Sequence, residues 1–209
     1  MYGGWKMSKG EQTRQRIVAE AASLFNRRGY HGSSLQDLME ATGLEKGGIY
    51  RHFSSKEELA ALAFDHAWNE ALEARQRGID HISNNADKLK QFITNFARRR
   101  PSIPAGCPLL NTAVDSDDGN PLLRDHARKA LKSWQERMES MIADGIKARH
   151  IRAGVDARKL ANLIIASLEG ALMISRLERN DEALREAQEH LHAYIEAEVR
   201  TANKRNRLR

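Results

Sequence analysis

The sequence predicts an all-α protein. Only 4 of its 209 residues are proline and 14 are glycine, and the segments between them are rich in Ala, Leu, Glu and Arg, which favour helix. Apolar residues recur at helical spacing along these segments, whereas no run alternates apolar and polar residues with β-branched enrichment. Residues that cap or stop helices divide the chain into about nine helices.

The first two helices are bounded by clear signals. A first helix is predicted over residues 11–28, and Gly29 ends it. Its apolar stripe consists of Ile17, Ala21, Leu24 and Phe25. Ser34 and Asp37 form a capping box that opens a second, short helix, which ends near Gly43.

The third and fourth helices follow closely. Residues 46–53 are predicted to form a third helix of about two turns. Ser54 and Ser55 precede Glu57 and Glu58, so a second capping box opens a fourth helix, whichever serine caps it. That fourth helix should extend to about residue 77.

The remaining helices are delimited by prolines, glycines and aspartates. We predict a fifth helix over residues 85–100, a short sixth from about 106 or 107, a seventh over 121–150 with Pro121 in its first turn, an eighth capped by Asp156 and ending near 179, and a ninth over 181–200.

Two short helices joined by a turn occupy residues 33–53, as in a helix-turn-helix, where the second helix enters the major groove of DNA. Leu38 and Ile49 are predicted to pack these helices together. Ile17, Leu24 and Phe25 of the first helix would brace them. The third helix is too short to be stable alone, so its neighbours must hold it and its outer face is free to contact a partner.

That outer face carries side chains able to reach phosphates or base edges, namely Lys46, Tyr50, Arg51 and His52. The third helix also contains Gly47 and Gly48. Each glycine costs about 1 kcal/mol in a helix, so the pair indicates close approach to a partner rather than a gain in stability.

A resemblance to the DNA-binding head of TetR-type regulators is carried by the stretch GYHGSSLQDLMEATGLEKGGIYRHFSSKEELAAL. The match covers about residues 13–67 without an insertion, and it depends on the spacing of Gly29, Gly43, Tyr50, Phe53, Lys56 and Leu59.

The resemblance implies specific DNA contacts. Tyr50, His52 and Lys56 look like backbone-phosphate contacts, and Lys46, Gly47 and Gly48 lie at the groove. Ser33, Ser34 and Thr42 sit where the family also touches phosphate. Each residue has a structural alternative, because serines there serve as helix caps, Tyr50 is also compatible with a surface aromatic and Lys56 with a solvated first turn.

The resemblance also implies a division into a DNA-binding domain over residues 8–72, a ligand-sensing and dimerisation domain over 73–200, and a basic tail over 201–209. The eighth and ninth helices would pair with those of a second copy. The eighth helix agrees, because apolar side chains cover more than one of its stripes. A monomeric core would explain the same pattern, and the tail is compatible with a frayed terminus as well as a DNA-binding arm.

A pocket for an unknown small-molecule effector is expected in the body by family analogy. Candidate lining residues are Trp68, Phe92, Phe96, Cys107, Leu110, Trp134, Met138 and Met173. Aromatic residues and methionines at helical spacing are also typical of an ordinary core. Gly106 and Cys107 resemble a family branch in which some members sense electrophiles or oxidants, but we favour an inert, packed thiol.

We therefore predict a homodimeric repressor that binds a palindromic operator and is released by a small-molecule, electrophile or oxidant inducer. The net charge of +6 is compatible with a DNA partner. No Ser-His-Asp arrangement, phosphate loop or metal-ligand cluster stands out, so no enzyme activity, metal or cofactor is expected. A helical protein-interaction adaptor is the rival interpretation, and an activator is a variant of the first.

The sequence favours a cytoplasmic protein without a membrane span. A single cysteine allows no intramolecular disulfide, and the N-terminus lacks an apolar signal core. The most apolar stretch, residues 160–174, contains Asn162 and Glu169 and is short for a bilayer.

Overall fold

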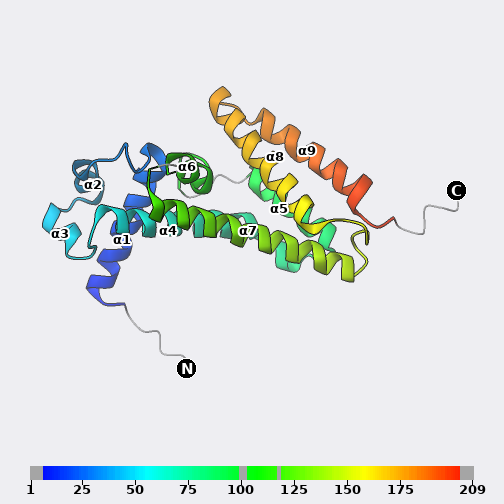
Figure 1. Cartoon of the computed structure of the whole chain (residues 1–209), viewed down its shortest axis with the longest axis horizontal. Helices are drawn as coiled ribbons and strands as arrows, with labels where there is room; N and C mark the ends of the chain where they lie inside the picture. Colours follow the sequence, from blue (N-terminus) through cyan, green and yellow to red (C-terminus); the bar gives the residue numbers. More distant parts are fainter. Residues whose placement is uncertain (1–6, 99–102, 117–118, 203–209) are drawn as a thin grey trace. The chain divides into compact units, whose positions relative to one another are not determined.

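A computed structural model describes residues 7–98, 103–116 and 119–202 of the chain, and these residues are helical as predicted (Figure 1). The described residues contain nine α-helices and no β-strand, with one isolated bridge between Ile151 and Arg200. The helices are α1 (Lys9–Arg28), α2 (Leu35–Thr42), α3 (Lys46–Tyr50), α4 (Lys56–Gln76), α5 (Asn85–Arg98), α6 (Pro108–Asp115), α7 (Pro121–Lys147), α8 (Ala157–Glu178) and α9 (Glu182–Tyr194). Most of the predicted basic tail, residues 203–209, lies outside the described residues.

The chain divides into two compact units. One, here called the head unit, comprises Met1–Ala71 and Pro101–Ala130, and the other, the body unit, comprises Leu72–Arg100 and Leu131–Arg209. The sequence predicts a body over residues 73–200. In the structure α6 and the first part of α7 pack instead with α1–α4, because side chains of α6 contact α1, as described below.

The core of the head unit holds α2 and α3 against α1 and α4. Ile17, Leu38 and Ile49 are at most 1% exposed and belong to one apolar cluster, as predicted. Leu24 and Phe25 pack against this cluster while remaining partly exposed. These contacts supply the stability that so short a third helix cannot supply itself.

Several helix starts agree with the predicted caps. The Ser34 and Asp37 side chains form the predicted reciprocal capping box of α2, and Asp156 caps α8 by accepting a hydrogen bond from the Lys159 N–H. At α4, Ser55 accepts from the Glu58 N–H and the Glu58 carboxylate accepts from the Ser54 N–H. Both predicted serines therefore take part in that cap.

Some helix boundaries differ from prediction. The first helix begins at Lys9 rather than 11, because Ser8 and Glu11 form a further capping box. The third ends at Tyr50 rather than 53, where the His52 N–H bonds to the Ile49 carbonyl in a tighter turn. The ninth helix changes at Ile195–Val199 into a π-helical segment.

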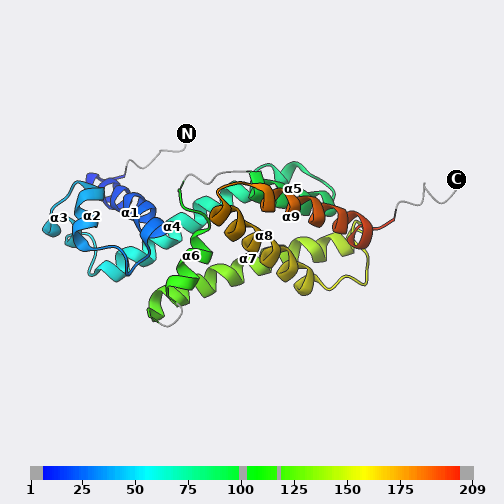
Figure 2. The same ribbon diagram turned by 90° about the horizontal axis from the view of Figure 1, so that it is seen from above.

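The body unit is built around α5, α8 and α9. Helices α8 and α9 lie side by side in both views, and α5 packs against both (Figures 1 and 2). α8 spans 22 residues and is apolar and long enough, by length and composition alone, to cross a membrane. The core helices of soluble proteins share this property.

Candidate nucleic-acid interface

Helices α2 and α3 are joined by a tight turn at Gly43. This glycine adopts a left-handed conformation, with φ 66° and ψ 24°, and its N–H bonds to the Met39 carbonyl. A left-handed residue is favourable for glycine because it has no Cβ. The chain then re-enters a helix at Lys46, with the Gly48 and Ile49 N–H groups donating to the Glu45 carbonyl. The arrangement is a helix-turn-helix.

The outer face of α3 presents a cation and an aromatic ring to solvent. Ile49 is 1% exposed and anchors the helix, whereas Lys46, Gly47, Tyr50 and Arg51 are exposed. Lys46 and Tyr50 are four residues apart and so share one side of the helix. The structure therefore brings these predicted contacts together on one surface.

His52 lies at the margin of that surface. It is half-buried, and its ring centroid lies 6.3 Å from that of Phe53. Its neighbour Phe53 is 2% exposed and belongs to the core of the head unit. The imidazole therefore packs partly against the core of the head unit.

Two predicted phosphate contacts have their hydroxyl groups turned inward. Ser33 is 1% exposed and donates a 2.7 Å hydrogen bond to the Gly29 carbonyl, and Thr42 is 2% exposed and donates to the Leu38 carbonyl. Neither hydroxyl reaches the surface of the described head unit. In this geometry both hydroxyl groups serve the fold, and their contact with DNA stays a prediction.

Ser34, by contrast, stays exposed and caps α2. Its hydroxyl accepts from the Asp37 N–H at 3.1 Å, and the Asp37 carboxylate accepts from the Ser34 N–H at 2.7 Å. The Ser34 hydroxyl and backbone N–H, in that order, lower the pKa of Asp37. Asp37 also pairs with Arg28, whose side chain is half-exposed.

Lys56 is held within the fold rather than extended into solvent. Its Nζ donates a 2.7 Å hydrogen bond to the Tyr30 carbonyl and lies 4.3 Å from the centre of the Tyr30 ring. Partial burial lowers the pKa of Lys56, while the nearby carboxylates of Asp115 and Asp37 oppose that shift. The lysine therefore holds the loop after α1. A contact of Lys56 with phosphate would compete with its hydrogen bond to the Tyr30 carbonyl.

The structure adds two arginines that the sequence interpretation missed. The Arg16 Nη1 donates a 2.8 Å hydrogen bond to the Thr42 carbonyl, which places an exposed guanidinium beside the turn before α3. Arg14 lies over the Phe53 ring, 5.1 Å from its centre. Both are on α1, 26 or more positions before their partners, so only the tertiary fold could reveal them.

In the body unit, three of the predicted pocket residues meet in an aromatic cluster. Trp134 is fully buried, and its ring lies 6.0 Å from that of Phe92 and 6.1 Å from that of Phe96. Met138 is 1% exposed on the same helix as Trp134. These side chains fill the core of the body unit.

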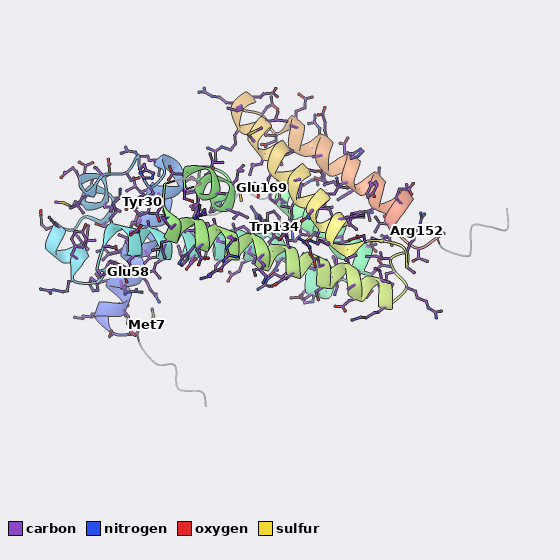
Figure 3. The ribbon with its side chains drawn as sticks, viewed as in Figure 1. Met7, Tyr30, Glu58, Trp134, Arg152 and Glu169 are labelled. Atoms are coloured by element: carbon purple, nitrogen blue, oxygen red, sulfur yellow. The ribbon has the colours of Figure 1, made fainter. Side chains whose placement is uncertain are left out.

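A buried ion pair adjoins this cluster and was not predicted. The Arg75 guanidinium lies 4.4 Å from the centre of the Phe96 ring and 4.8 Å from that of Trp134. Arg75 Nη2 is 3.9 Å from the Glu169 Oε1, and both side chains are at most 12% exposed. Trp134 and Glu169, on α7 and α8, are labelled in Figure 3.

The other predicted pocket residues are dispersed. Met173 is 51% exposed, because it lies between Ala171 and Ser175, which both face inward, and so points away from the core. It does not line a buried site within this chain. Trp68 and Cys107 are buried and Leu110 is half-buried, and all three belong to the head unit.

The head unit has a cleft of its own between α1, α4, α6 and α7. Phe25, Asn26, Phe64, Asn111 and Asp115 are among the residues that line it. The free space within it is about 20 Å³, which is room for one water molecule. An effector of ordinary size does not fit there.

Two family models match the sequence. The model described as bacterial regulatory proteins, tetR family, matches residues 17–63, and the one described as tetracyclin repressor-like, C-terminal domain, matches residues 86–191. The first match contains the helix-turn-helix, and the second contains all but the first residue of α5 and the whole of α8.

Solved structures and curated relatives agree with these matches. A TetR transcriptional regulator from Chloroflexus aurantiacus J-10-FL is 46% identical, with a TM-score of 0.90 over 94% of this chain and 100% of that one. A TetR-family regulator from Cytophaga hutchinsonii is 34% identical, with a TM-score of 0.88 over 95% and 100%. The HTH-type transcriptional repressor DhaR of Mycobacterium sp. (strain GP1) is 28% identical over 82% of this chain and 86% of that protein.

Proposed function

Because the chain belongs to the TetR family of DNA-binding transcriptional regulators, we propose that it is a repressor that binds a palindromic operator as a homodimer and is released by an inducer. The observation that carries this proposal is the exposed face of α3, where Lys46, Tyr50 and Arg51 stand on a helix held from behind by Ile49. We place the protein in the cytoplasm, with the DNA it regulates.

The proposed contact set follows the exposed side chains. Lys46 and Arg51 would reach base edges or phosphates, and Tyr50 and His52 would bond to phosphate. Arg16 joins this set, since its guanidinium is exposed beside the turn before α3. Ser34 would contribute at the start of α2, and Lys56 would act by positioning the loop at Tyr30.

The exposed side of α8 supports dimerisation through this helix and α9. Four large apolar side chains share that side, namely Leu163 (44% exposed), Met173 (51%), Ile174 (42%) and Leu177 (77%). Between them, a Cβ placed on Gly170 would meet no atom within 4 Å, so a second helix has room to approach closely. An apolar stripe of this length is typical of a contact surface, and two-fold pairing is the commonest form of assembly.

Among the possible inducers, burial favours a small molecule over an electrophile or oxidant. Cys107 is 2% exposed at the start of α6, and reactive cysteines are generally accessible. We propose that the effector site of the body would open where Phe92, Phe96, Trp134 and Met138 now fill the core, with the Arg75–Glu169 pair as its charged part.

A DNA titration tests the proposal. The full-length chain is added to labelled duplexes from the region upstream of its own gene across a salt series, together with variants Tyr50→Ala and Lys46→Ala. We expect tight binding that falls steeply with salt, that is lost in Tyr50→Ala, and whose logarithmic salt slope falls by about 1 in Lys46→Ala. Lys132→Ala, an exposed lysine of α7, is the matched control and should bind as the wild type does.

Weak binding to every fragment, unaffected by the two α3 substitutions, would overturn the proposal and favour the protein-interaction adaptor.

A further inference from the structure

The carboxylate of Asp115, at the end of α6, binds the backbone of the loop between α1 and α2. Its Oδ2 accepts a 2.6 Å hydrogen bond from the N–H of Tyr30, a residue labelled in Figure 3. The loop leaves space for the carboxylate at Gly29, where an added Cβ would lie 2.7 Å from the Asp115 Oδ1. A hydrogen bond to an ionised acceptor is about twice as strong as one between neutral groups, so this contact holds the loop well.

The carbonyl group of Tyr30 is held as well. It accepts from the Lys56 Nζ at 2.7 Å and from the Ser33 N–H at 3.4 Å. Ser33 also donates through its hydroxyl to the Gly29 carbonyl, and the next residue, Ser34, caps α2. Both backbone polar groups of Tyr30 are thus bound by side chains from α6 and α4. The turn that contains Tyr30 leads directly into the helix-turn-helix.

Helix α6 can hold this loop in place because its start is fastened to α1. The Asn111 side chain donates to the Asn26 carbonyl at 3.0 Å and to the Ala105 carbonyl at 2.8 Å. The Asn26 side chain donates to the Pro104 carbonyl at 2.7 Å. With these bonds formed, α6 presents Asp115 to the loop in one position.

The charge of Asp115 by itself would oppose DNA binding. Carboxylates repel the phosphates of a duplex and compete with them for cations. Burial lowers the pKa of Lys56, and the Asp115 charge opposes that shift, so the carboxylate acts on a cation of the head unit. If Asp115 were only a charge, its removal would strengthen DNA binding. Its hydrogen bond predicts the opposite, because a loop that is ordered beforehand loses no entropy on binding.

We propose that Asp115 is a positioning residue for DNA binding, which acts through the Tyr30 N–H on the start of α2. This inference rests on the proposed DNA-binding function. With the bond formed, the turn of residues 29–33 is ordered before the duplex arrives, and Ser34 and α2 are ordered with it. Without the bond, the turn must be ordered during binding. The affinity then falls, whereas the number of phosphate contacts stays the same.

The experiment titrates the upstream duplex with full-length Asp115→Ala and Asp115→Asn across a salt series, well below the Tm of each protein. Asp115→Ala removes the acceptor and should weaken binding by about 10-fold, the effect of ordering roughly one more residue. Its logarithmic salt slope should equal that of the wild type, because no phosphate contact is lost. Asp115→Asn keeps an acceptor oxygen without the charge, so it should bind within about 2-fold of the wild type.

Two further variants separate geometry from charge. Asp115→Glu keeps the charge but moves the acceptor by one methylene group, so it should weaken binding as Asp115→Ala does. It takes the place of Asp115→Ala if the alanine variant does not fold. Asp125→Ala is the matched control, because it removes another carboxylate of the head unit, on α7. It should bind the duplex no more weakly than the wild type.

Three results would overturn the inference. If Asp115→Ala binds at least as tightly as the wild type while Tyr50→Ala loses binding, the proposed function stands and Asp115 has no positioning role. If Asp115→Ala and Asp115→Asn lose equal affinity, the charge matters rather than the hydrogen bond, and the inference is wrong. If the wild type shows no salt-dependent binding, the proposed function fails and the inference fails with it.

Discussion

The backbone N–H of Tyr30 donates a 2.6 Å hydrogen bond to the carboxylate of Asp115, 85 positions later in the chain. This bond joins the end of α6 to the loop between α1 and α2. On the same loop the Tyr30 carbonyl accepts from Lys56 at the start of α4. Three helices are thus fixed to one peptide segment immediately before the helix-turn-helix.

Gly29 should be irreplaceable beside this bond. Its backbone has φ 74° and ψ 169°, a region accessible essentially to glycine alone, and a Cβ there would lie 2.7 Å from the Asp115 Oδ1. We expect Gly29→Ala to lower the free energy of unfolding by about 2–3 kcal/mol in urea denaturation. Gly78→Ala is the comparison, because Gly78 has φ 79° and ψ 0°, a left-handed conformation that other residues also adopt, and no atom lies within 4 Å of its added Cβ, so it should lose less stability. An equal loss in both variants would show that neither the Asp115 contact nor the backbone conformation of Gly29 adds to the cost.

Removing one partner of the buried pair Arg75–Glu169 should destabilise the protein strongly, whereas replacing both partners with apolar residues should destabilise it little. Glu169→Leu alone leaves the guanidinium buried without this carboxylate, and we expect a loss of about 3–5 kcal/mol of unfolding free energy. The double variant Arg75→Met with Glu169→Leu should recover most of that loss, as replaced buried pairs do. Glu136→Ala, which removes the exposed partner of Lys132, should change stability by less than about 1 kcal/mol. No recovery in the double variant would mean that the pair has a further structural role.

Stability should fall at mildly acidic pH because of His192. Burial is the main cause of its lowered pKa, with the Lys90 and Arg98 charges adding to it, while a hydrogen bond to the Lys90 carbonyl and the Glu196 charge oppose it. The folded state therefore favours the neutral ring of His192. The contribution of His192 to the free energy of unfolding is complete above its unfolded pKa, and it is lost as the pH falls from there through the lower folded pKa.

The test is urea denaturation at three pH values from about 7.5 to 5.5, which bracket the ordinary histidine pKa. The wild type should lose more stability over this range than His192→Gln does. His190→Gln, at an exposed position of α9, serves as the control and should follow the wild type. Parallel curves for the wild type and His192→Gln would show that another group sets the pH dependence.

A charge on the apolar stripe of α8 should separate the proposed dimer. Leu177 is 77% exposed in the single chain, and Val114 of α6 is 74% exposed. Leu177→Glu would bury a carboxylate in the interface, which is strongly unfavourable without a partner, so sedimentation should detect a monomer at concentrations where the wild type is dimeric. Val114→Glu should remain dimeric. A dimer that survives Leu177→Glu would place the interface elsewhere.

Local signals account for what the sequence predicted well. The caps at Ser34 and Asp156 lie within three residues of their partners, so they are visible in the chain itself. The core positions Ile17, Leu38 and Ile49 follow from helical periodicity, and the resemblance supplied the candidate face of α3. The π-helical end of α9 has no comparable local signature.

Long-range contacts account for what it missed. The burial of Thr42 and the pairing of Arg75 with Glu169 depend on which helices pack together. The residues within one helical turn of these positions do not indicate that packing. In the sequence Asp115 resembles any polar residue at a helix end, and only the fold shows that it accepts a hydrogen bond from the Tyr30 N–H. The exposure of Met173 could not be predicted either, because two apolar sides of α8 cannot be told apart from composition alone.

The contacts of α6 limit how the DNA-binding region can be exchanged between proteins. Asn26 donates to the Pro104 carbonyl, and Asn111 donates to the Asn26 carbonyl. A chimera that transfers residues 8–72 alone would lose the hydrogen bonds of Asn26 to Pro104 and Asn111, and the bond of Tyr30 to Asp115. The transferable DNA-binding unit is therefore made of two separate segments of the chain. A chimera that carries residues 103–130 together with residues 8–72 should keep the cooperative unfolding of this unit when it is joined to the body of another protein.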